Sequence, residues 1–292
     1  MHLAVSMWSY FRTWKTGNFD ISAFIWEARN AGAEGVELLD FFYKGQGTNT
    51  GAMTAEEVAP ERDKALRALD DTGLPCPIFS VAQNFAKEDP QERAVQLQKI
   101  RFGVDEARHF GAKVVRVFAG DLHGNLTFDQ SRSWIIEGLT EASLYAQDHD
   151  IHLALENHGT LAGRGDQVRG IIEEVRERAS NEALGANPDT GNFLLVDQPS
   201  HEAIRQVADL AYMVHFKDFA HAPERHEGFA YESLAGKKFV GKAVGEGIVD
   251  LHACIAALKD AAFDGWLSVE YEGEEDPLTA VPRSIENARK YL

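Results

Sequence analysis

Three carboxylates and one imidazole follow short apolar runs in the second half of the chain, and together they have the chemistry of a metal site. Glu156 ends IHLALE, Asp189 follows LGANP, His215 lies in AYMVHF and Glu270 ends GWLSVE. Such groups cannot all stay ionised in one buried mouth without a counter-charge, which a divalent cation supplies. A lone Glu or Asp at a strand end is often a helix cap or solvated. Four such residues in phase instead predict one divalent ion, and oxygen ligands with one nitrogen suit Mn²⁺, Co²⁺, Mg²⁺ or Zn²⁺.

These four residues can meet only if the strands that carry them are neighbours. Apolar runs rich in β-branched or aromatic residues alternate along the chain with longer segments of helical period. The expected strands are 2–10, 35–43, 77–85, 113–120, 151–159, 184–193, 211–219 and 265–273. The expected helices are 19–31, 54–72, 89–111, 127–149, 166–179, 200–210, 250–262 and a last one that reaches Leu292.

Eight strand–helix units in 292 residues predict an α/β fold, a single (β/α)8 TIM barrel over residues 1–292. A doubly wound sheet has the same alternation, but the count of eight and the even spacing favour the closed barrel. In such a barrel the carboxyl ends of the strands meet at one mouth, where catalytic groups lie. Local signals agree, because Asp20 is placed to cap the first helix. The helix over 166–179 also carries one apolar stripe, made of Val168, Ile171, Ile172 and Val175.

The polar segment 220–249 interrupts this rhythm, and we expect an extended loop that forms a lid over the mouth or a subunit contact. It contains GKKFVGKA, which resembles the phosphate-binding pattern GxxxxGK[ST]. Ala243 stands where that pattern needs a hydroxyl, and no apolar strand runs directly into it. A phosphate-binding loop is therefore rejected.

Composition excludes several classes of protein. The chain has 29 Lys and Arg against 46 Asp and Glu, a net charge of −17, which argues against a nucleic-acid partner. No apolar run approaches the ~18 residues of a membrane span. The start of the chain lacks signal-peptide features, and Cys76 and Cys254 make no disulfide framework. We expect a cytoplasmic protein with no membrane partner.

Further polar residues near the expected strand ends are candidates for substrate binding. The period of a strand puts His158 on the same face as Glu156, and Lys217 on the same face as His215. His158 is a substrate contact, an additional acid or base, or an ordinary hydrogen-bonded support. Lys217 steadies a developing oxyanion or forms an ion pair with a neighbouring carboxylate.

Other candidates come from the first half of the chain. Arg116 and Asn84 are candidates to bind sugar hydroxyls, and Glu37 is a candidate partner behind a metal ligand. Trp8, Trp14 and Phe85 form an apolar wall for a sugar ring or belong to the core.

Several stretches resemble a known family. These are LALENHG, NPDTGNF, VHFKDF and VGEGIVDLHACIAALKDAAFDGWLSVEYEG. They are similar to the sugar phosphate isomerase/epimerase superfamily with its xylose isomerase-like barrel, which includes ketose 3-epimerases, hydroxypyruvate isomerase, inosose isomerase and dehydratase, and type IV endonucleases. The resemblance covers essentially the whole chain. It implies that Glu156, Asp189, His215 and Glu270 correspond to the family's metal ligands, and that the two glutamates also move protons.

The sequence departs from the ketose-epimerase pattern at two positions that contact substrate in those enzymes. Asn192 stands where they carry a histidine three residues after the metal aspartate. Lys217 and His221 stand in the region where they carry an arginine. The departures favour substrates other than simple ketoses, and they make Asn192 a further substrate-binding candidate.

The expected activity is a divalent-metal-dependent isomerase or epimerase of a sugar, keto-sugar or inosose. Either Glu156 or Glu270 abstracts a proton beside a carbonyl to give a metal-bound enediolate, and the other, on the opposite face, returns a proton. The alternative is a lyase on the same site, either inosose-dehydratase-like or eliminating a substituent from a 3-keto-glycoside. A non-catalytic sugar-binding subunit is less expected, because a binder does not need two opposed glutamates. A nuclease needs more ligands and a basic surface. Relatives often form dimers or tetramers, so a homo-oligomer is also an expectation.

Overall fold

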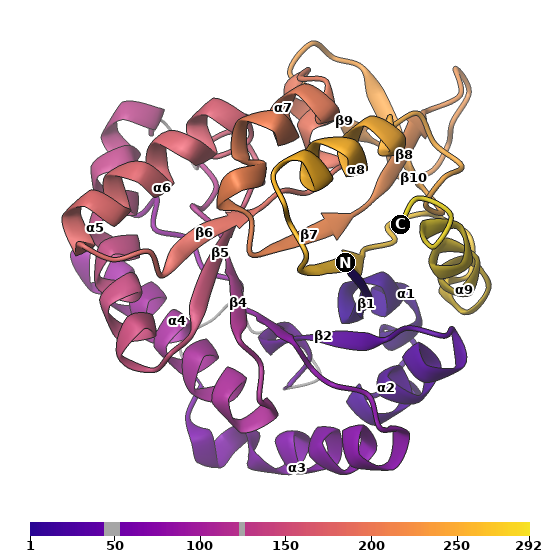
Figure 1. The fold of residues 1–292 in the computed structure, drawn as a ribbon, viewed down its shortest axis with the longest axis horizontal. Helices are drawn as coiled ribbons and strands as arrows, with labels where there is room; N and C mark the ends of the chain where they lie inside the picture. Colours follow the sequence, from indigo (N-terminus) through magenta and orange to yellow (C-terminus); the bar gives the residue numbers. More distant parts are fainter. Residues whose placement is uncertain (44–52, 123–125) are drawn as a thin grey trace.

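The computed structural model describes residues 1–43, 53–122 and 126–292. Within these residues, eight parallel strands form a nearly closed barrel with helices around it (Figure 1). The strands are β1 (His2–Ser6), β2 (Gly35–Leu39), β3 (Ile78–Ser80), β4 (Val114–Val117), β5 (His152–Glu156), β6 (Leu184–Asn187), β7 (Met213–Phe216) and β11 (Trp266–Val269). This architecture confirms the predicted TIM barrel.

The strand order is β6-β5-β4-β3-β2-β1-β11-β7, which leaves β6 and β7 at the two ends of the sheet. Two isolated parallel bridges join these ends, one between Ala186 and Ala211 and one between Asp189 and His215. The second bridge pairs two of the predicted metal ligands directly. The strands are buried almost throughout, as expected for a parallel sheet covered by helices.

Helices follow the strands and enclose the barrel, as Figure 1 shows. They are α2 (Ile21–Asn30), α3 (Ala55–Thr72), α4 (Pro90–Phe110), α5 (Phe128–Asp148), α6 (Gly165–Ala179), α7 (Ser200–Val207), α8 (Leu251–Asp260) and α9 (Pro277–Ala288), preceded by the short α1 (Phe11–Trp14). Asp20 caps α2 as predicted, because its side chain accepts from the Ala23 amide at 3.0 Å. The predicted stripe on α6 is buried at all four positions. In the described ranges no helix is long and apolar enough to cross a membrane.

The strands are shorter than the apolar runs that predicted them. After β2 the chain turns into a 3-10 helix, Asp40–Phe42, and β3 ends at Ser80. The apolar pattern continues beyond the strand ends because the loops at the mouth are themselves packed, with Val81 and Phe85 fully buried. Asn84 and His158 therefore lie in loops beyond β3 and β5, not on the strands.

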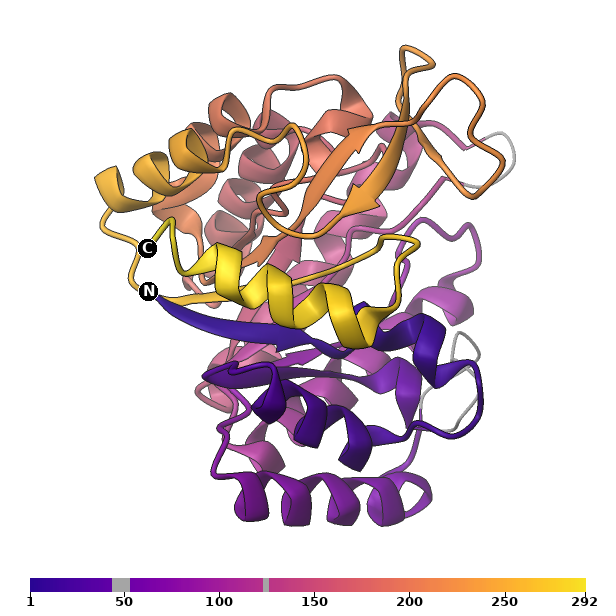
Figure 2. The same ribbon diagram turned by 90° about the vertical axis from the view of Figure 1, so that its right-hand side faces the viewer.

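The segment expected to be an extended loop contains a small antiparallel sheet in the order β8-β10-β9. Its strands are β8 (Asp218–His221), β9 (Tyr231–Glu232) and β10 (Lys238–Lys242). Phe219 and Phe239 are buried between them, so the FV of GKKFVGKA serves packing. In Figure 2 this sheet lies toward the end of the barrel opposite the two chain termini.

Asp218 fastens this sheet to the loop before α8. Its carboxylate accepts hydrogen bonds from the backbone amides of Gly245 at 3.0 Å, Gly247 at 2.8 Å and Val249 at 3.2 Å. Burial raises the pKa of Asp218, and these three bonds act in the opposite direction. The residue that follows Lys217 therefore ties the start of β8 to the loop directly before α8.

Replacing Asp218 with Ala removes the acceptor for three partly buried amides. We expect a loss of about 2 kcal/mol in the free energy of unfolding and faster proteolysis within 243–249. Chemical denaturation and limited proteolysis with mass spectrometry measure both. Asp250→Ala, which removes the cap that accepts from Ala253 at the start of α8, is the control: it should cost about 1 kcal/mol and leave the loop resistant.

Candidate metal centre

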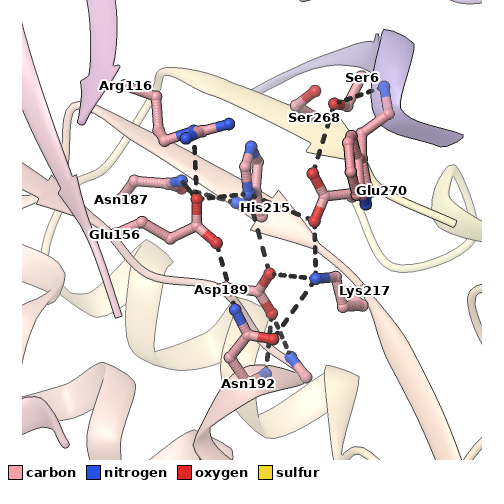
Figure 3. Close-up of polar contacts among 12 residues, drawn as sticks. Ser6, Arg116, Glu156, Asn187, Asp189, Asn192, His215, Lys217, Ser268 and Glu270 are labelled. Atoms are coloured by element: carbon pink, nitrogen blue, oxygen red, sulfur yellow. Dashed lines mark hydrogen bonds and ion pairs between the residues drawn. The ribbon is translucent and has the colours of Figure 1, made fainter. Parts of the chain in front are cut away.

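The four predicted ligands meet at the carboxyl ends of their strands (Figure 3). Glu156 ends β5, Asp189 follows β6, His215 lies in β7 and Glu270 follows β11. Each is buried and offers one ligand atom, and these atoms all lie within 4.8 Å of one another. Nδ1 of His215 is 3.3 Å from Glu156 Oε2 and 3.8 Å from both Asp189 Oδ2 and Glu270 Oε2. They make a possible four-residue metal site.

Two buried atoms at the centre of this group have no hydrogen-bond partner, namely His215 Nδ1 and Asp189 Oδ2. Lys217 Nζ lies 2.9 Å from Asp189 Oδ2, but the pair forms an ion pair without hydrogen-bond geometry. Burying a polar atom without a hydrogen bond costs about 1–3 kcal/mol, so a native site normally has a reason for it. These two atoms, an imidazole nitrogen and a carboxylate oxygen, lie 3.8 Å apart. A cation between them would give both of them a partner.

Backbone and amide contacts aim Asp189 at this centre. Its Oδ1 accepts from the amides of Gly191 at 2.8 Å and Asn192 at 2.9 Å, which turns Oδ2 inward. Asn157 holds the Asp189 backbone from both sides, since its Nδ2 donates to the carbonyl at 3.1 Å and its Oδ1 accepts from the amide at 2.6 Å. Burial raises the pKa of Asp189 to about 6.

Glu37 on β2 holds the other side of the His215 ring. Nε2 of His215 lies 3.1 Å from both carboxylate oxygens of Glu37. Ser80 and Ser268 donate to the same carboxylate at 2.5 and 2.6 Å. Burial alone would raise the pKa of Glu37, but His215, Arg116 and Ser268 lower it to about 2. A carboxylate that accepts the Nε2 proton leaves Nδ1 free to bind a metal, which is the usual support of a metal-binding histidine.

The two glutamates have different neighbours. Glu156 Oε2 lies 3.2 Å from Arg116 Nε, and its Oε1 accepts from Asn192 Nδ2 at 3.2 Å. Glu270 Oε2 lies 2.6 Å from Lys217 Nζ, and its Oε1 accepts from Ser6 Oγ at 3.4 Å. Burial would raise the pKa of each, but nearby cations lower it: His215 and Arg116 act on Glu156, and Lys217 and His215 act on Glu270. Both therefore stay ionised at neutral pH.

The cluster holds more negative than positive charge. Its carboxylates are Glu37, Glu156, Asp189, Glu270 and Glu272, and its basic groups are Arg116, His215 and Lys217. Burial would lower the pKa of His215, but Glu37, Glu270 and Glu156 raise it well above its usual value. Even a protonated His215 leaves an excess of acidic groups, which a divalent ion offsets. The residues present therefore fit a metal ion in both charge and donor type.

A cavity of about 430 Å³ opens on this cluster. The substrate candidates Arg116, His158, Asn192 and Lys217 line it together with Trp8. Asn84 does not, because its amide binds the loop backbone at Asp121 and Ala86. Trp14 and Phe85 also lie outside the lining, and Trp14 packs against Phe41 and Phe42.

Among the lining residues that the sequence did not predict are Asp40, Tyr231 and Glu272. Burial raises the pKa of Asp40 to about 7, despite the opposing charge of Arg116. Glu272 accepts from Trp8 Nε1 at 2.6 Å. Asp40 directly follows the apolar run GVELL and was open to the same argument as the four ligands. Tyr231 lies on a strand that was expected to be loop, so no strand-end argument could find it.

Comparison with known proteins agrees with this geometry. The family model described as "Xylose isomerase-like TIM barrel" matches residues 25–291. The chain belongs to the xylose isomerase-like TIM barrel family. The family confirms the resemblance drawn from the sequence motifs.

Sequence relatives within the family are enzymes of sugar metabolism. An inosose dehydratase from Lacticaseibacillus casei is 25% identical over 158 residues, which are 53% of this chain and 51% of the relative. The matched stretch thus spans about half the length of that relative. An L-ribulose-5-phosphate 3-epimerase from Salmonella paratyphi C is 22% identical over 231 residues, 77% of this chain and 75% of that enzyme.

Solved structures of the family share the fold. A 3-keto-D-glucoside 4-epimerase from E. coli superposes with a TM-score of 0.73 at 16% identity and covers 99% of both chains. The IolI protein with a bound zinc atom has a TM-score of 0.71 at 16% identity, covering 100% of this chain and 96% of that one. A xylose isomerase-like TIM barrel protein from Mycobacterium smegmatis in complex with magnesium has a TM-score of 0.72 at 18% identity, covering 99% of this chain and 95% of that one. One of these two structures thus holds zinc and the other magnesium.

Replacing Glu37 with Gln tests the support behind His215. The amide cannot hold the Nε2 proton as a carboxylate does, so Nδ1 becomes a poorer ligand, and we expect Mn²⁺ affinity to fall by about 10- to 100-fold. Isothermal titration calorimetry of wild type and variant measures this. An unchanged affinity would show that the Glu37–His215 contact only packs the barrel.

Asp40 makes stability depend on pH. Its pKa is about 7 when folded and 3.8 in the reference state, so the folded protein binds this proton more tightly. The resulting stability is complete below pH ~4 and is lost as the pH rises to about 7. Relative to Asp40→Asn, the wild type should lose roughly 2 kcal/mol of unfolding free energy between pH 5 and pH 8. Denaturant titrations at the two pH values measure the difference, with Asp20→Asn as the exposed control; a pH-independent difference contradicts the prediction.

Proposed function

We propose that this chain is a divalent-metal-dependent isomerase or epimerase that moves a proton beside the carbonyl of a sugar, keto-sugar or inosose. The observation that carries the proposal is the pair of unpartnered atoms, His215 Nδ1 and Asp189 Oδ2, between two buried glutamates. Both glutamates line the same cavity, one on each side of His215 in Figure 3. Ligands and proton-transfer groups are thus available at one place.

The proposed ligands are Glu156, Asp189, His215 and Glu270, for one Mn²⁺, Co²⁺, Mg²⁺ or Zn²⁺ ion. When bound, such an ion polarises a carbonyl and a neighbouring hydroxyl, which acidifies the hydrogen between them. The remaining steps belong to the chain itself. Glu156 and Glu270 are ionised at neutral pH, so either can take the proton. The other glutamate gains a proton from water and delivers that proton to the opposite face, while the first releases its own to water, so no net proton is gained or lost. Return to the same carbon gives an epimer, and return to the adjacent carbon gives an isomer.

Neighbouring residues support this division of work. Asn192 is a neutral amide bonded to Glu156, so it orients that glutamate and takes no proton itself. Arg116 holds Glu156 from the other side. Lys217 and His158 face the cavity and are proposed to bind substrate oxygens. Tyr231, Glu232 and Leu234 of the segment 220–249 also line the cavity, which supports a covering role for that segment within a single domain.

A lyase on the same site is the second candidate, and Asp40 favours it. With a pKa of about 7, Asp40 is partly protonated at neutral pH and can donate a proton to a departing hydroxyl or glycosidic oxygen. A second cavity of about 580 Å³ adjoins the first and shares Trp8, Tyr231 and Glu272 with it. Its aromatic walls offer room for a departing group. The dehydratase among the relatives agrees with this reaction class.

The metal is tested by elemental analysis of purified wild type beside His215→Ala and Glu270→Gln. We expect about one divalent ion per chain in the wild type and much less in both variants. Asp70→Asn, on the exposed face of α3, is the matched control and should keep its ion. No ion in the wild type, and none on titration, would remove the metal from the proposal.

The reaction is tested by incubating the metal-bound protein with ketoses, inososes and 3-keto-glycosides and measuring the molecular masses of the products by mass spectrometry. An isomerase or epimerase gives products of equal mass, whereas a lyase releases water or an aglycone. Glu156→Gln should lower turnover at least ~100-fold, because it removes a proton-transfer group. A sugar-binding subunit would instead lose only metal affinity. The predicted cytoplasmic location and homo-oligomeric state remain predictions.

A further inference from the structure

Lys217 lies between the proposed metal ligands instead of beside them. Its Nζ is 2.6 Å from Glu270 Oε2 and 2.9 Å from Asp189 Oδ2, and only 3% of its side chain is exposed. These are the same two oxygens that face His215 Nδ1 at 3.8 Å. Figure 3 shows the lysine reaching both carboxylates. An ion held by the cluster would share both oxygens with the ammonium group.

Sharing these oxygens is electrostatically unfavourable. An oxygen that binds both an ammonium nitrogen and a metal ion holds the two cations about 4 Å apart. The repulsion of a divalent ion is twice that of a single charge at the same distance. Buried charges are screened little by solvent and salt. Lys217 and the ion therefore oppose each other at these two residues.

Lys217 has two other partners, which are not proposed metal ligands. Its Nζ lies 3.1 Å from Glu272 Oε2 and donates to Asn192 Oδ1 at 3.4 Å. Glu272 is itself held by Trp8 Nε1 at 2.6 Å. The ammonium group can thus move away from Asp189 and Glu270 and still keep an ion pair and a hydrogen bond. The carboxylate of Glu272 is already within ion-pair distance to receive it.

We propose that Lys217 competes with the divalent ion for Asp189 and Glu270, and that Glu272 holds the lysine when the ion binds. The inference rests on the proposed metal site and adds a determinant of its affinity. The lysine keeps two buried carboxylates compensated in the absence of metal, and it weakens metal binding by the same contacts. Lys217 thereby lowers the affinity for the metal and raises the stability of the metal-free barrel.

The experiment compares wild type with Lys217→Met and Lys217→Gln. We expect Mn²⁺ to bind at least about tenfold more tightly to both variants, because the competing charge is gone. We also expect the chelator-treated variants to melt at lower temperature than chelator-treated wild type, because two buried carboxylates lose their cation. Calorimetric titration with Mn²⁺ and thermal unfolding measure the two effects. Neither readout depends on knowing the substrate.

Lys99→Met is the matched control. Lys99 is a buried lysine of α4 that donates to the Ala82 carbonyl at 3.4 Å. Its removal takes one buried ammonium from the barrel without touching a proposed ligand, so Mn²⁺ affinity should stay within about twofold of wild type. If Lys217→Met does not survive chelation, both Lys217 variants are purified with Mn²⁺ and the rate of its release to EDTA is measured. Slower release than from wild type supports the proposal.

The role of Glu272 is tested by a double-variant comparison. Glu272→Gln should weaken Mn²⁺ binding in the wild type, because the lysine then stays on the ligands. The same change in a Lys217→Met background should have a much smaller effect. An equal effect in both backgrounds would show that Glu272 acts through its own charge and would overturn its assigned role.

The outcomes separate this inference from the proposed function. If the wild type binds Mn²⁺ and the Lys217 variants bind it equally or more weakly, the competition is refuted while the metal site stands. If neither wild type nor variants bind, both the site and the inference fall. Tighter binding by the variants, including binding seen only in the variants, supports the competition.

Discussion

The structure depends on the compensation of several carboxylates that the barrel buries at one end. Glu37, Glu156, Asp189 and Glu270 all lie within the protein, where an unpaired charge is costly. His215 touches or approaches each of these four carboxylates: Nε2 faces Glu37, and Nδ1 faces the other three. Arg116 and Lys217 add the remaining positive charge from opposite sides. The chemistry proposed for the site follows from this excess of negative charge, since three acidic oxygens around one imidazole nitrogen favour a cation.

The surrounding loops keep these groups in place through specific hydrogen bonds. Asn157 grips the Asp189 backbone, and the amides of Gly191 and Asn192 turn its carboxylate inward. Lys217 and Asp218, which follow His215 and Phe216 in the sequence, have two separate roles. Lys217 points into the cluster, while Asp218 fastens the loop before α8. A short motif thus links the centre of the barrel to the small sheet, whose strand β9 lines the cavity.

The sequence was sufficient for the barrel and for the four residues that meet. The alternation of apolar runs with helical segments predicts the barrel, and the common mouth of a barrel brings the ends of successive strands together, whatever the exact strand boundaries are. The positions of Asn84 and Trp14 could not be predicted in the same way, and neither residue lines the cavity. Asn84 lies in a loop and Trp14 in a short helix, and no sequence periodicity encodes how these segments pack. The charge argument also named a metal as the counter-ion but could not see that Lys217 reaches the same oxygens. The sequence named Glu37 as a candidate partner behind a metal ligand, but only the folded chain shows that this ligand is His215.

The place where the sheet closes has a consequence of its own. β6 and β7 form the seam of the barrel, and three backbone hydrogen bonds of the described residues cross it there. Tyr212 donates to the Ala186 carbonyl at 2.9 Å, Thr190 to the His215 carbonyl at 3.0 Å, and His215 to the Pro188 carbonyl at 3.2 Å. Side chains reinforce it, because Asn187 Oδ1 accepts from the His215 amide at 2.8 Å and Thr190 Oγ1 donates to the Lys217 carbonyl at 2.6 Å. Two of the four proposed ligands, Asp189 and His215, stand on opposite sides of this seam. An ion bound by both residues would cross-link β6 and β7, so that binding the ion would also strengthen the closure of the barrel.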